Sequence, residues 1–252
     1  MSDEHDLSIY SSPGGKFARF IAQRLLMRPY FSSVLHVQLH GKENLKKLKS
    51  PFITIANHSS HLDACMVFTY LPWRLSKTLA AGAAADYFFT KWYKKLGTRL
   101  FFNSYPVERA KDKRKKGLSG ELLEHGIPIL IFPEGTRSRT GAMGAFNPGA
   151  PALSISRDVP ILPIAMVGNY AAMPYGSSRP VPGRPDVHVV FGLPMKASAG
   201  EDAEQFAERL RRYIIELHDT TARAYSMPTQ ADFDRAVALR TAAVPEGELP
   251  PY

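Results

Sequence analysis

Two short polar clusters in this 252-residue sequence combine side-chain types that can do chemistry. In the first, at residues 57–63, His58 lies five positions before Asp63. A histidine within reach of a carboxylate can act as a general base, because the carboxylate fixes the tautomer of the imidazole and stabilises the imidazolium that forms. Five residues turn an ideal helix by about 140°, so the two side chains can meet only if His58 lies before a helix that Asp63 helps to begin.

Other interpretations of this first cluster are open on sequence alone. Asp63 or Ser60 can be a helix N-cap beside an ordinary loop histidine. A metal site built from His58, His61 and Asp63 would need a further ligand, and no other His pair or Cys cluster supplies one. Ser59 lacks the Gly-x-Ser-x-Gly elbow that exposes a nucleophilic serine, so we interpret it as a cap. The residues of this cluster therefore leave a general-base pair and a helix cap both open, and they favour no metal.

The second cluster, at residues 132–139, has the composition of an anion site. Gly135 permits close approach of the backbone, Thr136 and Ser138 offer hydroxyls, and the guanidinium of Arg137 can bind a phosphate or carboxylate through two hydrogen bonds. The alternative is a surface turn with solvated arginines, because all of these are ordinary turn residues.

The charge of the chain favours an anionic partner. Lys and Arg total 32 against 23 Asp and Glu, which gives a net charge of +9 and a pI of about 9.6. Residues 91–116 hold ten basic and two acidic side chains among interleaved aromatic residues, a composition that suits a lipid headgroup region. Arg109 in this stretch is a further candidate anion ligand. No nucleic-acid-binding motif accompanies the basic residues, so we expect no nucleic acid.

Compartment and membrane contact can also be predicted. The single cysteine, Cys65, excludes a disulfide framework and favours a reducing compartment. The longest late stretch without charge, residues 159–178, contains three prolines and two glycines and cannot be a plain membrane span. Residues 1–12 carry three acids and no basic residue, which is the wrong polarity for a signal peptide. Any membrane contact is therefore expected to be peripheral.

The two clusters follow predicted strands, which is where sites collect in α/β sheets. Apolar runs rich in β-branched or aromatic residues alternate with segments of helical character. This alternation predicts an α/β fold with a mixed, largely parallel sheet of about seven strands covered by helices. The expected strands are residues 34–39, 52–56, 78–81, 99–102, 127–132, 161–167 and 187–191, and the expected helices are residues 61–71, 85–96, 110–125, 148–156, 200–224 and 231–240.

The ends of the chain differ from its centre. Residues 15–31 predict a helix with four basic residues and no acid among apolar side chains, which suits an anionic membrane surface. Its polar and apolar faces separate imperfectly, so packing against the core is the alternative. We divide the chain into an N-terminal segment at 1–35, an α/β domain at 36–225, and a C-terminal helix with a Pro-rich tail at 226–252.

Four sequence blocks, taken in order, resemble the glycerolipid acyltransferase family, and most closely the bacterial 1-acyl-glycerol-3-phosphate acyltransferases. Residues 57–63 match the block Asn-His-x4-Asp, and residues 132–138 match Phe-Pro-Glu-Gly-Thr-Arg-Ser without a mismatch. Residues 159–164 match Val-Pro-Ile-x-Pro-Ile. The remaining block, residues 105–109, is the loosest match and ends in Arg109.

This resemblance implies direct transfer of a fatty acyl group from acyl-CoA or acyl carrier protein to the 2-hydroxyl of 1-acyl-glycerol-3-phosphate, giving phosphatidic acid. It implies no metal, no other cofactor and no covalent intermediate. His58 would deprotonate the hydroxyl and Asp63 would hold the imidazole. The phosphate-binding region that the resemblance implies consists of Arg109, Glu134, Gly135, Thr136 and Arg137.

The expected partners are therefore a lysophospholipid, an acyl thioester, an anionic membrane surface and acyl carrier protein, at the cytoplasmic face of the cell membrane. A nearer alternative keeps the chemistry and changes the acceptor to another lysophospholipid or a glycolipid. Further alternatives are a thioesterase, a phosphoesterase with a metal on the histidines of the first cluster, and a membrane-binding module without turnover.

Overall fold

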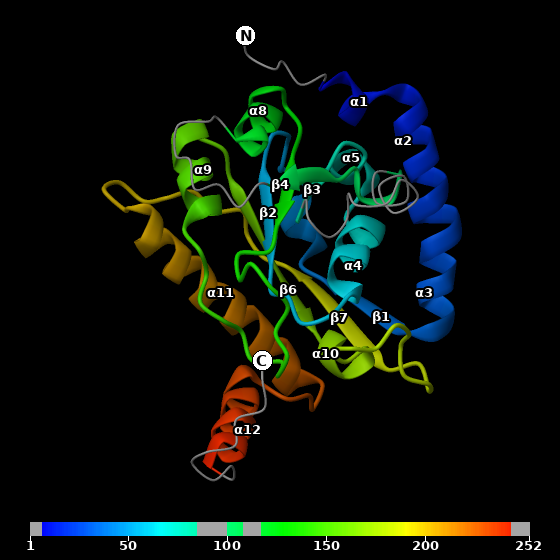
Figure 1. The fold of residues 1–252 in the computed structure, drawn as a ribbon, viewed down its shortest axis with the longest axis vertical. Helices are drawn as coiled ribbons and strands as arrows, with labels where there is room; N and C mark the ends of the chain where they lie inside the picture. The colour runs from blue at the N-terminus through cyan, green and yellow to red at the C-terminus, as the bar shows by residue number, and fades with distance from the viewer. Residues whose placement is uncertain (1–6, 85–99, 108–116, 243–252) are drawn as a thin grey trace.

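A mixed sheet lies at the centre of the computed structural model, which describes residues 7–84, 100–107 and 117–242 (Figure 1). The sheet has seven strands in the order β1-β7-β6-β2-β5-β3-β4. The strands are β1 (His36–His40), β2 (Ile53–Ala56), β3 (Ala80–Ala84), β4 (Tyr105–Val107), β5 (Ile129–Ile131), β6 (Ile161–Val167) and β7 (Asp186–Phe191).

Most neighbouring strands run in the same direction. The pairs from β6 through β2, β5 and β3 to β4 are all parallel. β7 is antiparallel to β6 and parallel to β1. The predicted α/β fold with a mixed, largely parallel sheet of about seven strands is therefore confirmed.

Helices cover both faces of the sheet (Figure 1). One face packs against α8 (Leu118–Glu124), α9 (Gly149–Arg157) and α11 (Ala203–Ala224). The other face packs against α3 (Arg28–Val34), α4 (Leu62–Tyr70) and α5 (Trp73–Ser76). The remaining described elements are α1 (Ser8–Ser11), α2 (Pro13–Phe20), the π-helix η1 (Ile21–Met27), the 3-10 helix η2 (Lys42–Leu45), α10 (Asn169–Ala172) and α12 (Gln230–Ala242).

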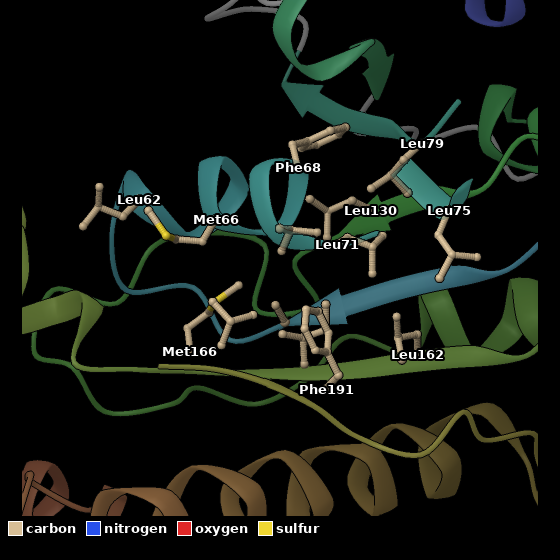
Figure 2. Close-up of a cluster of buried hydrophobic side chains, with 14 of the residues drawn as sticks. Leu62, Met66, Phe68, Leu71, Leu75, Leu79, Leu130, Leu162, Met166 and Phe191 are labelled. Carbon is tan, nitrogen blue, oxygen red and sulfur yellow. The ribbon is translucent and has the colours of Figure 1, made fainter. Parts of the chain in front are cut away.

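Coverage of both faces explains the composition of the central strands. All seven residues of β6 and all four of β2 are buried, so these strands do not alternate between apolar and polar residues, and Thr54 is the one polar residue in either strand. Successive side chains point to opposite faces, and Ile129 and Leu130 accordingly belong to different apolar clusters. Figure 2 shows the cluster beneath α4, where Met66 and Leu71 face side chains of the sheet, among them Met166 and Phe191.

The N-terminal segment packs along α4 and α5 as a nearly continuous helix through α2, η1 and α3 (Figure 1). The side chains of Arg19, Gln23 and Phe31 are buried. Arg24 donates hydrogen bonds to the carbonyl of Leu71 and the hydroxyl of Ser76. Burial lowers the pKa of both Arg19 and Arg24 to about 10. The predicted helix at residues 15–31 is confirmed, and one side of it is part of the core.

One predicted strand, residues 99–102, is wrong. Residues 100–102 are helical, and the strand of this region is β4, three residues later. Asn103 follows with a φ of 48°, and its side-chain amide donates to the carbonyls of Tyr10 and Thr78, which fixes the turn into β4. The aromatic rings of Phe101 and Phe102 do pack in the core, but burial alone does not distinguish a helix from a strand. The helix predicted at residues 85–96 lies outside the described residues.

A histidine pair between β1 and β7 makes stability depend on pH. His188 is fully buried, its Nδ1 lies 3.0 Å from Nε2 of His40, and the ring of Tyr225 lies 4.1 Å from it. Burial, and secondarily the neighbouring His40, lower the pKa of His188 to about 4. The unfolded chain binds this proton at about pH 6.5, so the contribution of His188 to stability is present above that pH and is lost as the pH falls toward 4.

We expect the free energy of unfolding of the wild type, relative to His188→Gln, to fall by about 3 kcal/mol between pH 7 and pH 4. Glutamine cannot titrate but keeps an amide near His40, so the comparison isolates the ionisation from other carboxylates and histidines. Urea unfolding at several pH values measures the difference. Parallel curves for the two proteins would show that the buried ring does not resist protonation.

Candidate active site

The two polar clusters meet at one edge of the sheet. Residues 57–63 follow β2 and residues 132–139 follow β5, and these neighbouring strands are parallel. The segment that follows β6, on the other side of β2, reaches the same edge. The carboxyl ends of parallel strands form the usual site of an α/β sheet. The backbone N–H of Ser138 donates to the carbonyl of His58 at 2.7 Å, so the two clusters are in direct contact.

His58 and Asp63 form the expected pair. Nδ1 of His58 lies 2.9 Å from Oδ2 of Asp63, which also accepts from the backbone N–H groups of Ser59 and Ser60 at 2.7 and 2.8 Å. Helix α4 begins at Leu62, after His58 and with Asp63 in its first turn, as the five-residue spacing required.

The environment of this pair divides the roles of its members. Asp63 is fully buried, and its Oδ2 accepts hydrogen bonds from two backbone N–H groups. The same oxygen accepts from Nδ1 of His58, so the proton of the ring is fixed on Nδ1. The His58 side chain keeps 20% of its surface exposed. Nε2 is therefore the nitrogen left for an incoming hydroxyl, and the bonds that Asp63 accepts hold the ring in place.

Asn169, the first residue of α10, also contacts Asp63, and sequence reasoning missed it. Its side-chain amide donates to Oδ1 of Asp63 at 2.7 Å, so both carboxylate oxygens have partners. Asn169 is buried, and its own Oδ1 has no hydrogen-bond partner among the described residues. The available signal was a polar residue two positions after the predicted strand 161–167, close to the position that marked the first two clusters.

Asn57 locks the strands that carry these loops. Its side chain donates to the carbonyl of Met166 at 3.0 Å and accepts from the backbone N–H of the same residue at 2.8 Å. This two-point contact joins the ends of β2 and β6, just before the segments that carry His58 and Asn169. The asparagine of the Asn-His block therefore serves the geometry of the site.

The ring of Phe132 and the carboxylate of Glu134 fix the other side of His58. Phe132 stacks on the imidazole with ring centroids 3.9 Å apart and planes 16° apart. Oε1 of Glu134 accepts from the backbone N–H of His58 at 2.7 Å, and Oε2 accepts from the N–H of Gly144 at 2.9 Å. Burial raises the pKa of Glu134, and these two backbone bonds oppose that rise. Glu134 thus joins three loop segments.

Replacing Glu134 with glutamine is expected to slow the acyl transfer that the sequence resemblance implies by about tenfold. The backbone N–H of either His58 or Gly144 would then face an amide N–H instead of an oxygen. The loops on either side of the His58 backbone would then be less well fixed. Steady-state rates and thermal unfolding of Glu134→Gln measure the effect. Glu204→Gln is the control. Glu204 is exposed on α11, so this substitution also removes one negative charge, but away from the site. Equal rates for the two variants would argue against a positioning role.

The remaining residues of the second cluster face solvent or an aromatic ring. Gly135 and Thr136 are exposed, and Gly135 has a φ of 74°, which favours glycine. The guanidinium carbon of Arg137 lies 4.8 Å from the ring centroid of Tyr175. The structure therefore brings Glu134, Gly135, Thr136 and Arg137 to the same loop beside His58. Arg109 lies outside the described residues, so its role stays a prediction.

His61 makes no hydrogen bond to the His58–Asp63 pair. Partial burial lowers its pKa, and the positive charges of Arg137 and His58 lower it further. No group of three or more His, Cys, Asp or Glu side chains is arranged to hold a metal ion within the described ranges. The site therefore combines a base held by a carboxylate with an arginine on the adjoining loop.

Comparison with known proteins identifies the family of the chain. The profile of the family described as Acyltransferase matches residues 36–167, which is more than half of the chain. An acyltransferase named 1-acyl-sn-glycerol-3-phosphate acyltransferase from Pseudomonas aeruginosa is 30% identical over 189 residues, covering 75% of this chain and 70% of its own. This chain therefore belongs to the Acyltransferase family.

Two further similarities extend the comparison. The chloroplastic 1-acyl-sn-glycerol-3-phosphate acyltransferase BAT2 from Brassica napus is 27% identical over 205 residues, which are 80% of this chain and 56% of that protein. The chain spans about half the length of several such relatives, between 52% and 56%. The crystal structure of the 1-acyl-sn-glycerophosphate acyltransferase PlsC from Thermotoga maritima matches with a TM-score of 0.57 and 26% identity, over 77% of each chain.

Proposed function

We propose that this protein is a 1-acylglycerol-3-phosphate O-acyltransferase, which transfers a fatty acyl group from acyl-CoA or acyl carrier protein to the 2-hydroxyl of 1-acyl-glycerol-3-phosphate and so makes phosphatidic acid. The observation that carries the proposal is the buried Asp63 carboxylate 2.9 Å from Nδ1 of His58, with Arg137 on the adjoining loop. Family membership and the names of the relatives support the same reaction.

In the proposed reaction, Nε2 of His58 takes the proton of the 2-hydroxyl as that oxygen bonds to the thioester carbonyl carbon. The carbon–sulfur bond of the tetrahedral intermediate then breaks. The imidazolium returns its proton to the departing thiolate, so the products are an ester and a free thiol. Asp63 stabilises the imidazolium between the two proton transfers. The atoms balance without a cofactor, since the thioester is already activated.

The acceptor phosphate is proposed to bind at the loop of residues 135–137. Arg137 supplies a charged fork, and the exposed backbone and hydroxyl of Thr136 supply further donors. Arg109 is proposed as an additional ligand on the sequence resemblance alone. Binding energy at this remote phosphate would hold the hydroxyl in place beside His58, which is worth a large share of the rate.

Mass-spectrometric product analysis tests the proposal. The full chain is mixed with several acyl-CoA and acyl carrier protein thioesters and a panel of lysolipids. The expected product is phosphatidic acid from lysophosphatidate, with transfer faster than release of free acid and insensitive to chelators. Acyl release alone would indicate a thioesterase, and acylation only of phosphate-free acceptors would contradict the assigned substrate.

We also propose peripheral attachment to the cytoplasmic face of the cell membrane through the outer side of the N-terminal helix. Phe17, Leu25 and Leu26 are 68%, 58% and 63% exposed there, with basic side chains nearby. Acyl thioester donors are cytoplasmic metabolites, which sets the face. Within residues 7–84, 100–107 and 117–242, no helix is long and apolar enough to cross a bilayer.

The triple substitution Phe17→Ser/Leu25→Ser/Leu26→Ser is expected to reduce sedimentation with anionic vesicles by more than about tenfold. Each apolar side chain contributes roughly 1.5–3 kcal/mol on burial. Substitution is preferable to truncation, since the opposite side of this helix is part of the core. Serine at Ile155, Leu193 and Leu239 is the control, since these residues are also exposed but lie on other elements. Equal losses would show that no particular side binds lipid.

A further inference from the structure

Two arginines of the second cluster share one aromatic ring. The guanidinium carbons of Arg137 and Arg139 lie 4.8 and 5.3 Å from the ring centroid of Tyr175. Both distances fall within the range of cation–π contacts. Tyr175 is 42% exposed and belongs to the loop between α10 and β7, outside every motif recognised in the sequence. Its ring is therefore in contact with two like charges at the edge of the site.

Within the part of the chain that the structure describes, the two charges have no anionic partner. No carboxylate of the described residues lies within 4.0 Å of either guanidinium. The Nη1 atom of Arg137 is buried and has no hydrogen-bond partner among those residues. A buried donor of a charged group without an acceptor is costly, and two close cations repel. Both costs are relieved when an anion with several oxygens binds between the arginines.

The loop that carries Tyr175 is fixed relative to the catalytic base. The hydroxyl of Ser60, in the His58 loop, donates to the carbonyl of Met173 at 2.8 Å. The hydroxyl of Tyr170 donates to the carbonyl of Arg139 at 3.1 Å. These contacts tie α10 and the residue that follows it to both polar clusters, so the segment leading to Tyr175 keeps a defined position beside the base.

We propose that Tyr175 is a positioning residue that sets Arg137 and Arg139 as a two-cation site for a phosphomonoester, and that it thereby favours phosphomonoester acceptors over phosphodiester ones. This inference rests on the proposed function. A phosphomonoester carries between one and a half and two negative charges at neutral pH and three free oxygens. A phosphodiester carries one charge and has two free oxygens. Two guanidinium groups therefore match the monoester and are in excess for the diester.

Kinetics with two acceptors test the inference. For Tyr175→Leu, which keeps bulk but removes the ring, we expect the KM for lysophosphatidate to rise by about tenfold while kcat stays within about twofold. The preference for lysophosphatidate over lysophosphatidylglycerol should fall by a similar factor. Tyr175→Phe keeps the ring face and should restore both values. Arg179→Ala is the control, because it removes an exposed charge from the same loop.

A binding measurement separates this inference from the proposed function. Isothermal titration of the full chain with sn-glycerol 3-phosphate needs no acyl transfer, and we expect the Kd to rise by about tenfold in both Tyr175→Leu and Arg139→Ala. Wild-type transfer to lysophosphatidate with unchanged binding and unchanged preference in both variants would overturn the role of Tyr175. Wild-type binding without any transfer would instead refute the proposed function and leave the anion site supported.

Discussion

With His58 replaced by glutamine, acyl transfer to lysophosphatidate should fall by about two to four orders of magnitude, because the hydroxyl loses the group that accepts its proton. Glutamine is similar in length to histidine, and its side chain can turn so that the amide donates to the Asp63 oxygen that Nδ1 contacts now at 2.9 Å. The variant should therefore unfold at nearly the wild-type temperature. Product formation by mass spectrometry and a thermal melt on the same preparation measure the two quantities.

His61→Gln is the matched control, since it removes a second imidazole three positions further along the same loop. His61 makes no hydrogen bond to Asp63, whose partners are His58, Ser59, Ser60 and Asn169. We expect this variant to retain most of its rate. Turnover near normal in His58→Gln would remove the base from the mechanism. Equal losses in both variants, reversed by added metal, would favour the phosphoesterase alternative.

Much of the site was predictable because its signals are local in the chain. Strands β2 and β5 are short and mostly apolar, and each is followed at once by residues that only a site or a turn would need. The five-residue spacing of His58 and Asp63 also fixed where α4 had to begin, and the structure places that helix at Leu62. These inferences use contacts between neighbours in sequence, for which pattern and propensity carry information.

The residues that sequence reasoning missed meet the site through long-range contacts. Asn169 lies 106 positions after Asp63 in the sequence, and no motif connects the two. Tyr175 belongs to a loop rich in proline and glycine, whose path a sequence pattern does not specify. Glu134 matched a motif, but which donors its two oxygens would bind depended on Gly144 and on the packing of another loop. Such positions are set by tertiary structure rather than by local preference.

Asp63→Asn is the second substitution with a large expected effect, a fall in rate of about two to three orders of magnitude. The backbone N–H groups of Ser59 and Ser60 both donate to Oδ2, so they should hold the oxygen of the new amide at that place. The amide nitrogen would then face Asn169, whose Oδ1 has no partner in the described part of the chain and can turn to accept from it. His58 therefore keeps its proton on Nδ1, and what is lost is the negative charge that stabilises the imidazolium.

Exchanging the two side chains tests this division between charge and hydrogen bond. In Asp63→Asn/Asn169→Asp the carboxylate returns to the site, but one group away from His58, because Asn169 contacts Asp63 and not the imidazole. We expect the exchange to recover about tenfold of the lost rate through the weaker electrostatic contact. Rates and thermal unfolding of the single and double variants provide the measurement. Complete recovery would mean that a nearby charge is sufficient and that direct contact of the carboxylate with Nδ1 is dispensable. A rate no better than that of Asp63→Asn would assign the whole effect to that direct contact.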